Sequence, residues 1–146
     1  MKDLYDNIAI VHLLDAQDIA AVSTESEILD RADFNGAGIA VNFGAIDVLA
    51  AGTDEVLPVL EESDTTEDAD FEPVAAGDIL GAFTKIDADT EDQATQFVGY
   101  IGTKRYIRVA IDVTSATLAH CLVSVDGILA YPGKAPAVGT DPVTAT

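Results

Sequence analysis

The residues best suited to nucleophilic or acid–base chemistry are two histidines, His12 and His120, and a single cysteine, Cys121. A cysteine nucleophile needs a base beside it, and a serine nucleophile needs a histidine that is oriented by a carboxylate. Because His120 and Cys121 are sequence neighbours, on a strand they point to opposite faces and cannot pair. We expect Cys121 to be a small core residue, and His12, between Val11 and Leu13, to be a structural or interface residue.

The common catalytic signatures are missing from the sequence. It contains no nucleophile elbow, phosphate-binding loop, dinucleotide fingerprint or paired-histidine metal motif. These observations predict a protein that is not an enzyme and that uses no cofactor and no metal.

An acidic segment, residues 61–70 with the sequence EESDTTEDAD, is rich in the oxygen ligands that calcium prefers. Its spacing does not match the twelve-residue calcium-binding loop, and the central glycine of that loop is missing. The segment is therefore predicted to be a solvated hairpin loop, with a cation site as the alternative.

Three of the seven basic residues lie close together, Lys104, Arg105 and Arg108, beside Tyr100 and Tyr106. We call these five residues the basic–aromatic set. Arginine and tyrosine dominate the energetics of protein interfaces, so the set could dock an acidic partner. Alternatively, its cations pair with the protein's own surplus of carboxylates. On a strand, Lys104, Tyr106 and Arg108 would face one way and Arg105 the other. We expect the set to organise a central strand and an adjoining subunit contact.

A second candidate contact lies in residues 1–20, where short apolar runs alternate with spaced charges. Four of its residues are too hydrophobic to be left in water without a role: Ile8, Ile10, Leu13 and Leu14. The segment is predicted either to add a strand to the fold or to lie as an arm across a neighbouring subunit.

The elements that must position these residues are predicted to be strands. The clearest pattern is in residues 107–113, where Ile107, Val109, Ile111 and Val113 share one face at period two. Pro58 cannot donate a ladder hydrogen bond, which indicates an edge strand or a bulge. Turn signals occur in residues 34–38 and 126–127.

Together these patterns predict an all-β fold, an antiparallel β-sandwich with extended terminal segments. The sequence has no long stripe at helical spacing with caps at both ends, so we expect little helix. The predicted organisation is an N-terminal strand or arm at 1–20, a β-sandwich domain at 21–131, and a tail containing proline and glycine at 132–146. The single cysteine excludes an intrachain disulfide.

Charge is the strongest compositional feature. Seven Lys and Arg residues face 26 Asp and Glu residues, which gives a formal net charge of −19. Phosphates repel such a surface, so we expect no direct contact with nucleic acid and none with an anionic membrane. The first residues lack the basic-then-apolar pattern of a signal peptide, which predicts a protein made and used without secretion.

The run FVGYIGTKRYIRV, residues 97–109, resembles sequences of small structural proteins of tailed bacteriophages. The run VLEESD at 59–64, the following loop to Phe71 and the opening MKDLYDNI at 1–8 are similar to the same family. The resemblance extends from residue 1 to about residue 132. It implies a β-sandwich, in agreement with the period-two pattern.

The function that the resemblance implies is virion structure, most specifically a head decoration (cement) protein. Such a protein would be made in the host cytoplasm, bind the outer surface of the phage head, and contact the major capsid protein. It would also contact its own copies as a homo-oligomer, a trimer. The alternatives are a neck or tail-tube component and, from a different class, a carbohydrate-binding adhesion module. The absence of tryptophan weakens the last of these, because such modules present exposed aromatic side chains.

Overall fold

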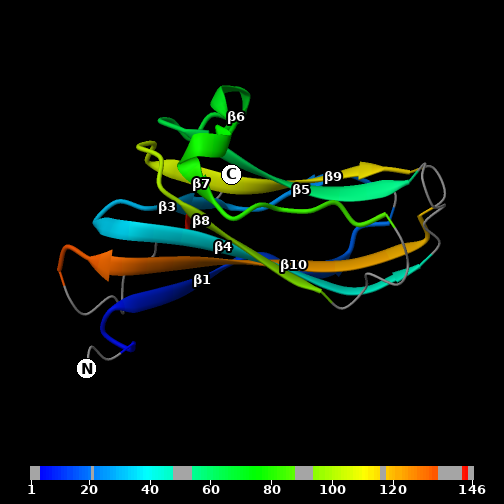
Figure 1. Cartoon of the computed structure of the whole chain (residues 1–146), viewed down its shortest axis with the longest axis horizontal. Helices are drawn as coiled ribbons and strands as arrows, with labels where there is room; N and C mark the ends of the chain where they lie inside the picture. Colours follow the sequence, from blue (N-terminus) through cyan, green and yellow to red (C-terminus); the bar gives the residue numbers. More distant parts are fainter. Residues whose placement is uncertain are drawn as a thin grey trace.

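The computed structural model describes residues 4–20, 22–47, 54–87, 94–115, 118–134 and 143–144. Two antiparallel sheets pack face to face in this part of the chain (Figure 1), which confirms the predicted all-β sandwich. Its helical elements are two short 3-10 helices, η1 (Asp68–Asp70) and η2 (Ala76–Asp78).

The first sheet, sheet A, has the strand order β1–β10–β4–β8–β7. Its strands are β1 (Ile8–Asp18), β10 (His120–Pro132), β4 (Phe34–Asp47), β8 (Thr95–Tyr100) and β7 (Ile79–Leu80). The N-terminal segment is therefore an edge strand of the fold, which is one of the two alternatives predicted for it. β1 pairs with β10, which is more than 100 residues away along the chain, with Ile10 opposite Ile128.

The second sheet, sheet B, has the order β11–β3–β9–β5–β6, and β2 also pairs with β9. Its strands are β11 (Val143–Thr144), β3 (Ile28–Asp30), β9 (Tyr106–Thr114), β5 (Glu55–Ser63), β6 (Glu72–Pro73) and β2 (Thr24–Glu25). The Val56 N–H donates to Ile86, and the Leu60 carbonyl accepts from Val74, so both groups point away from β9. Pro58 lies between Val56 and Leu60 at every second position, so its nitrogen also points away from β9. The missing N–H of Pro58 therefore costs no hydrogen bond to β9.

The core lies between the sheets and consists of inward-facing aliphatic side chains from both. Its fully buried members include Leu13, Leu29, Ile39, Val41, Ile107, Val109, Ile111, Val125 and Leu129. The period-two prediction for residues 107–111 is confirmed by these positions. Each such side chain contributes about 1.5–3 kcal/mol by leaving water, so the alternating strands supply the main stabilising term.

Two predicted turns are wrong, because residues 34–38 lie within β4 and residues 126–127 lie within β10. At Gly127 a Cβ atom would come within 2.9 Å of a methyl group of Leu29 and 3.1 Å of one of Leu13. The glycine therefore serves packing rather than chain reversal. It lets two leucines from different strands close over the backbone of β10.

The predicted C-terminal tail is partly wrong. β10 extends to Pro132, and Val143–Thr144 return to form β11 beside Leu29 and Ile28 of β3. Residues 135–142 and 145–146 of the predicted tail lie outside the described residues.

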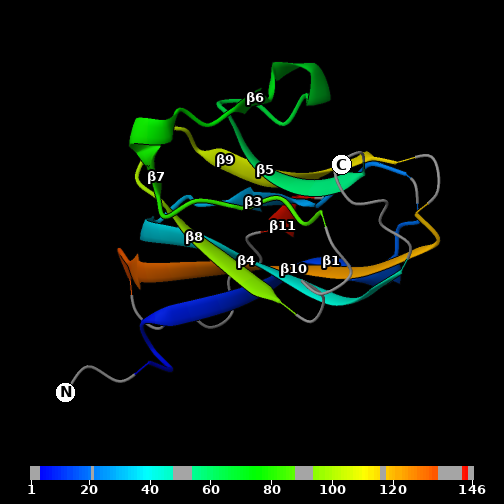
Figure 2. The same cartoon turned by 45° about the vertical axis from the view of Figure 1, so that its right-hand side comes forward.

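The connection between β5 and β7, residues 64–78, contains η1, β6 and η2. Its first part, with η1, lies over sheet B on the side away from sheet A, whereas β6 pairs with β5 at the edge of sheet B and η2 leads to β7 of sheet A (Figure 2). One outer face of the sandwich is therefore partly covered by the chain's own connection. The acidic segment 61–70 begins in β5 and ends in η1, and is a hairpin loop between β5 and β6.

Candidate functional site

Arg108 lies on the outer face of β9, yet only 5% of its side chain is exposed. Its Nε donates to Glu61 at 2.7 Å, and its Nη1 donates to Glu25 at 2.9 Å and to Asp68. The guanidinium carbon also lies 4.3 Å from the ring centre of Phe71. One cation therefore joins β2, β5, β9 and the connection that covers them.

The electrostatics of this cluster favour the charged arginine. Burial disfavours the cation, but the hydrogen bonds to Glu61 and Asp68 outweigh it, so the pKa of Arg108 is raised further above its ordinary value. A guanidinium suits this position because its planar array of donors can engage several carboxylates at once. The arrangement fastens the 64–78 connection to the sheet.

Tyr100, at the end of β8, is buried in the core, and its hydroxyl is hydrogen-bonded on both sides. The hydroxyl donates to Glu62 and accepts from the Lys104 N–H at 3.0 Å. Burial is the main reason why the pKa of Tyr100 is raised, and the hydrogen bond to Glu62 adds to it. A Cβ at Gly102 would lie 2.4 Å from the hydroxyl oxygen, so glycine is required where the turn closes over the ring. The phenol therefore holds the turn between β8 and β9.

Lys104 and Arg105 precede β9 instead of lying on it, so the predicted strand alternation fails for these two residues. Tyr106 and Arg108 do share the outer face of β9. Lys104 pairs with Asp64, and Arg105 donates to both oxygens of Asp30 at 2.9 Å and 2.7 Å. The described cations of the basic–aromatic set are thus all paired with carboxylates of the same chain.

The histidines and the cysteine are kept apart from one another. Cys121 is fully buried, and burial raises the pKa of its thiol to about 11, so it is a poor nucleophile. His120 is exposed and bonds Asp18 of β1, while His12 bonds Asp126 of β10 at 2.8 Å. The two histidines therefore link the same pair of strands, His12 from β1 and His120 from β10. Among the described residues, no cluster of metal-ligating side chains is arranged to hold an ion.

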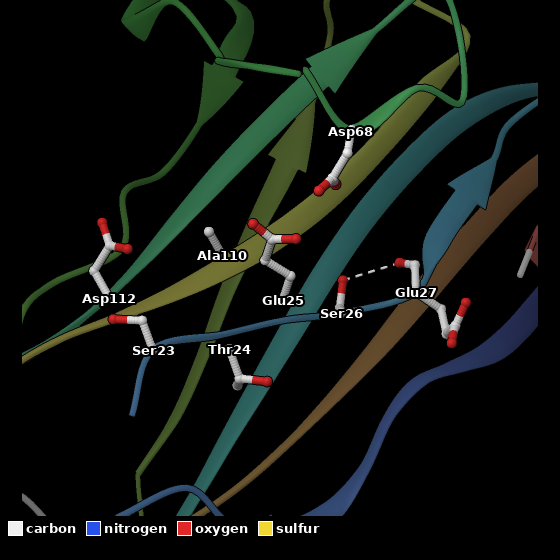
Figure 3. A pocket seen from close by; sticks show the side chains of 8 residues that line it. All are labelled: Ser23, Thr24, Glu25, Ser26, Glu27, Asp68, Ala110 and Asp112. Carbon is white, nitrogen blue, oxygen red and sulfur yellow. Dashed lines mark hydrogen bonds between the residues drawn. The ribbon is translucent and has the colours of Figure 1, made fainter. Parts of the chain in front are cut away.

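A groove of about 580 Å³ runs along the outer face of sheet B beside Arg108 (Figure 3). Its lining residues are Ser23, Thr24, Glu25, Ser26, Glu27, Asp68, Ala110 and Asp112. Two of its four carboxylates, those of Glu25 and Asp68, already bind Arg108. The hydroxyl of the buried Ser26 donates to the Glu27 carbonyl and accepts from the Val109 N–H. The polar groups of the groove are therefore used to join β2 to β9.

The outer face of sheet A has a different character. One half of it is formed by large apolar side chains of four strands, which we call the apolar face: Ile8, Ile10, Leu80, Phe97, Ile128 and Tyr131. The floor beneath them is glycine, because Ile128 is opposite Gly38, Gly38 is opposite Gly99, and Gly99 is opposite Leu80.

Two glycines of β4 are covered by rings from neighbouring strands. A Cβ at Gly38 would lie 2.7 Å from the ring of Phe97, and one at Gly36 would lie 3.1 Å from the ring of Tyr131. Tyr131 has a φ of 55°, a conformation that is rare for a bulky residue, and its N–H donates to the Asn7 carbonyl. The two rings therefore cover Gly38 and Gly36, and Leu80 covers Gly99.

The four predicted N-terminal contact residues separate into two pairs. Ile8 and Ile10 lie on the apolar face. Leu13 is buried in the core by the same alternation that buries Val11. A β-bulge in β1 between His12 and Leu14 brings Leu14 opposite Val125, so that Leu14 also packs against the core. These two residues are therefore unavailable to a partner.

Sequence reasoning missed Leu80, Phe97, Ile128 and Tyr131 as surface residues. They come from segments far apart in the chain, and only the strand order brings them together. The available signal was the glycine at Gly36, Gly38 and Gly99, since glycine on an exposed sheet face commonly lies beneath an aromatic ring of the next strand.

Comparison of the chain with protein-family models and with curated proteins finds no match. Among the described residues, no helix has the length and apolar character needed to cross a membrane.

Proposed function

We propose that this chain is a structural protein of a tailed-phage virion, a head decoration (cement) protein without enzymatic activity. It binds the outer surface of the assembled head, and it contacts the major capsid protein and its own copies as a trimer. The observation that carries the proposal is the role of the motif at 97–109. The motif that resembles phage structural proteins is part of the scaffold itself, with Tyr100 holding a turn and Arg108 fastening a connection.

The physical task of such a protein is to bind the assembled shell in preference to separated subunits. A ligand that binds only the assembled state stabilises that state by mass action. A rigid sandwich suits this task, because little conformational entropy is lost when a preformed surface docks. The paired cations of the basic–aromatic set support a structural role for that region.

The experiment is to locate the chain on purified particles of the phage that encodes it, by cryo-electron microscopy together with quantitative mass spectrometry. Many copies spread over the head at symmetry-related positions are the expected result. A single ring of a few copies at the neck or tail would contradict decoration and favour the alternative virion role. Absence from washed particles, together with binding on a glycan array, would overturn the virion assignment.

A further inference from the structure

The apolar face departs from the usual pattern of a sandwich. When one side of an antiparallel sheet packs on the core, the other side is normally polar. Here Ile10, Leu80 and Phe97 expose 74%, 58% and 56% of their surface. Single exposed apolar residues need no explanation, but Phe97 and Leu80 lie on the adjoining strands β8 and β7. Ile10, on the far edge strand β1, shares a register row with Leu80 through Ile128, Gly38 and Gly99, so the row crosses the whole sheet without a charged side chain.

The charges around this patch are unevenly placed. The six members of the apolar face are uncharged, and so are Gly38 and Gly99 beneath them. At its border along β1 and β10 lie two carboxylates, Asp15 and Asp126, which accompany His12, whereas Asp18, which accompanies His120, lies further along β1. The Asp15 side chain is 96% exposed. The patch thus has an apolar centre and a negative border on that side.

We infer that the apolar face docks onto a second protein whose surface is apolar at the centre of the contact and carries lysine or arginine opposite the exposed Asp15. This inference rests on the proposed function, under which the second protein is the major capsid protein on the outside of the head. Apolar side chains at the centre of an interface supply most of the affinity, and complementary charges at its rim guide encounter and fix register.

The charges beside the face decide among its other occupants. A second copy that docked through the same face would bring the same carboxylates, Asp15 and Asp126, to the border of the contact. An anionic membrane would be repelled by the same carboxylates. A partner with basic residues at its rim meets neither obstacle.

The experiment measures binding of the full chain to purified phage heads that lack it, by co-sedimentation over a concentration series. The variants are Ile10→Ser and Leu80→Ser, two exposed positions on different strands, so that a folding defect in one does not decide the outcome. Val22→Ser is the matched control, because Val22 is 66% exposed and is not a member of the apolar face. Circular dichroism and thermal unfolding check that each variant is folded.

We expect each face variant to bind heads about tenfold more weakly or worse, whereas Val22→Ser changes binding less than twofold. Asp15→Asn should slow association and reduce its dependence on salt, with little change in the dissociation rate. Face variants that are folded and bind as tightly as the wild type would overturn the inference while leaving the proposed function intact.

Two other outcomes also decide the question. If the wild-type chain does not bind heads, the proposed function is wrong, and the capsid is not the occupant of the face. If analytical ultracentrifugation shows that Ile10→Ser and Leu80→Ser abolish self-association while head binding is unchanged, the occupant is a second copy. That result would likewise overturn the inference.

Discussion

On the outer face of sheet B, the guanidinium of Arg108 is enclosed by Glu25, Glu61 and Asp68 and is covered by the chain's own connection. On the outer face of sheet A, Ile10 and Phe97 are exposed, and the ring of Phe97 lies over Gly38. The outer face of sheet B carries charged side chains that are paired with one another within the chain. The other is apolar, and more than half of the surface of each of these two side chains remains in contact with water.

The difference shows how a strongly acidic protein can keep one surface suitable for apolar contact. Carboxylates on sheet B are gathered around a buried cation, where they stabilise the fold. Carboxylates on sheet A are displaced from the apolar face, and two histidines accompany them. Net charge alone therefore does not describe how this chain would meet a partner.

The largest expected effect comes from removing the cation of sheet B. Arg108→Ala would leave Glu25, Glu61 and Asp68 close together without a counter-charge, and it would remove packing against Phe71. Breaking a buried ion pair by deleting one partner is strongly destabilising, and we expect a loss of about 3 kcal/mol. Urea unfolding monitored by circular dichroism measures it.

Arg105→Ala is the matched control for that experiment, because its pair with Asp30 is more exposed than the Arg108 cluster. We expect it to cost much less than Arg108→Ala, because solvent screens an exposed ion pair. Equal losses for the two arginines would show that Arg108 does not have the special role in sheet B described above.

The next effect compares the two sides of sheet A at two glycines. Gly127→Ala places a methyl group against Leu29 and Leu13 in the packed core, and we expect a loss of about 2 kcal/mol. Gly38→Ala meets the tip of the exposed Phe97 ring, which can swing away, so the loss should stay below about 1 kcal/mol. Thermal unfolding of both variants provides the comparison. A larger loss at Gly38 would mean that the outer face is as tightly packed as the inner one.

A smaller effect is expected at the turn that Tyr100 holds. Tyr100→Phe removes a hydroxyl that donates to Glu62 and accepts from the Lys104 N–H, which should cost about 1 kcal/mol. Tyr5→Phe, at an exposed position, serves as the reference and should change the free energy of unfolding by less than about 0.5 kcal/mol. If Tyr100→Phe changed the free energy of unfolding no more than Tyr5→Phe does, the hydroxyl of Tyr100 would not hold the turn between β8 and β9.

The smallest effect concerns the border of sheet A. The hydrogen bond from His12 to Asp126 raises the pKa of His12, and the charges of Asp126 and Asp15 add to it, although burial opposes it. Protonated His12 therefore stabilises the fold fully at pH values below its unfolded pKa of about 6.5, and this contribution is lost as pH rises through the raised folded value.

The variant His12→Gln measures this contribution of protonated His12 to the free energy of unfolding. Because His12 is about half exposed, solvent screening keeps its contribution to a few tenths of a kcal/mol. The difference in unfolding free energy between wild type and His12→Gln should be larger at pH 5.5 than at pH 8.5. A difference that grows with pH would have the wrong sign and would exclude the assigned ion pair.

Prediction from sequence succeeded where a local pattern determined the outcome. Ile107, Val109 and Ile111 alternate over a short stretch, and burying one face of the strand follows directly from that spacing. It failed where the environment of a residue is determined by a distant strand. Glycines in β4 and β10 resemble turn signals, but strand pairing places Phe97 against Gly38, and the packing of the two sheets places Leu29 against Gly127.

The candidate site was only partly predictable for the same reason. Ile8 and Ile10 were recognised because they are conspicuous within one segment, whereas the bulge that brings Leu14 against the core leaves no local mark in the sequence. The pairing of Arg105 and Arg108 with carboxylates of the chain was one of two open alternatives. Only the folded arrangement places Asp30 and Glu61 beside them.

The pairing of β1 with β10 also has a consequence for biosynthesis. His12 and Asp126 are partners at a separation of 114 residues, so β1 leaves the ribosome long before β10 exists. At about 5–20 residues per second, β1 waits roughly 6–23 seconds with Ile8, Ile10 and Leu13 uncovered. Sheet A therefore assembles late, and the nascent chain depends during that interval on the charges of Asp15 and Asp18 to remain free of aggregation.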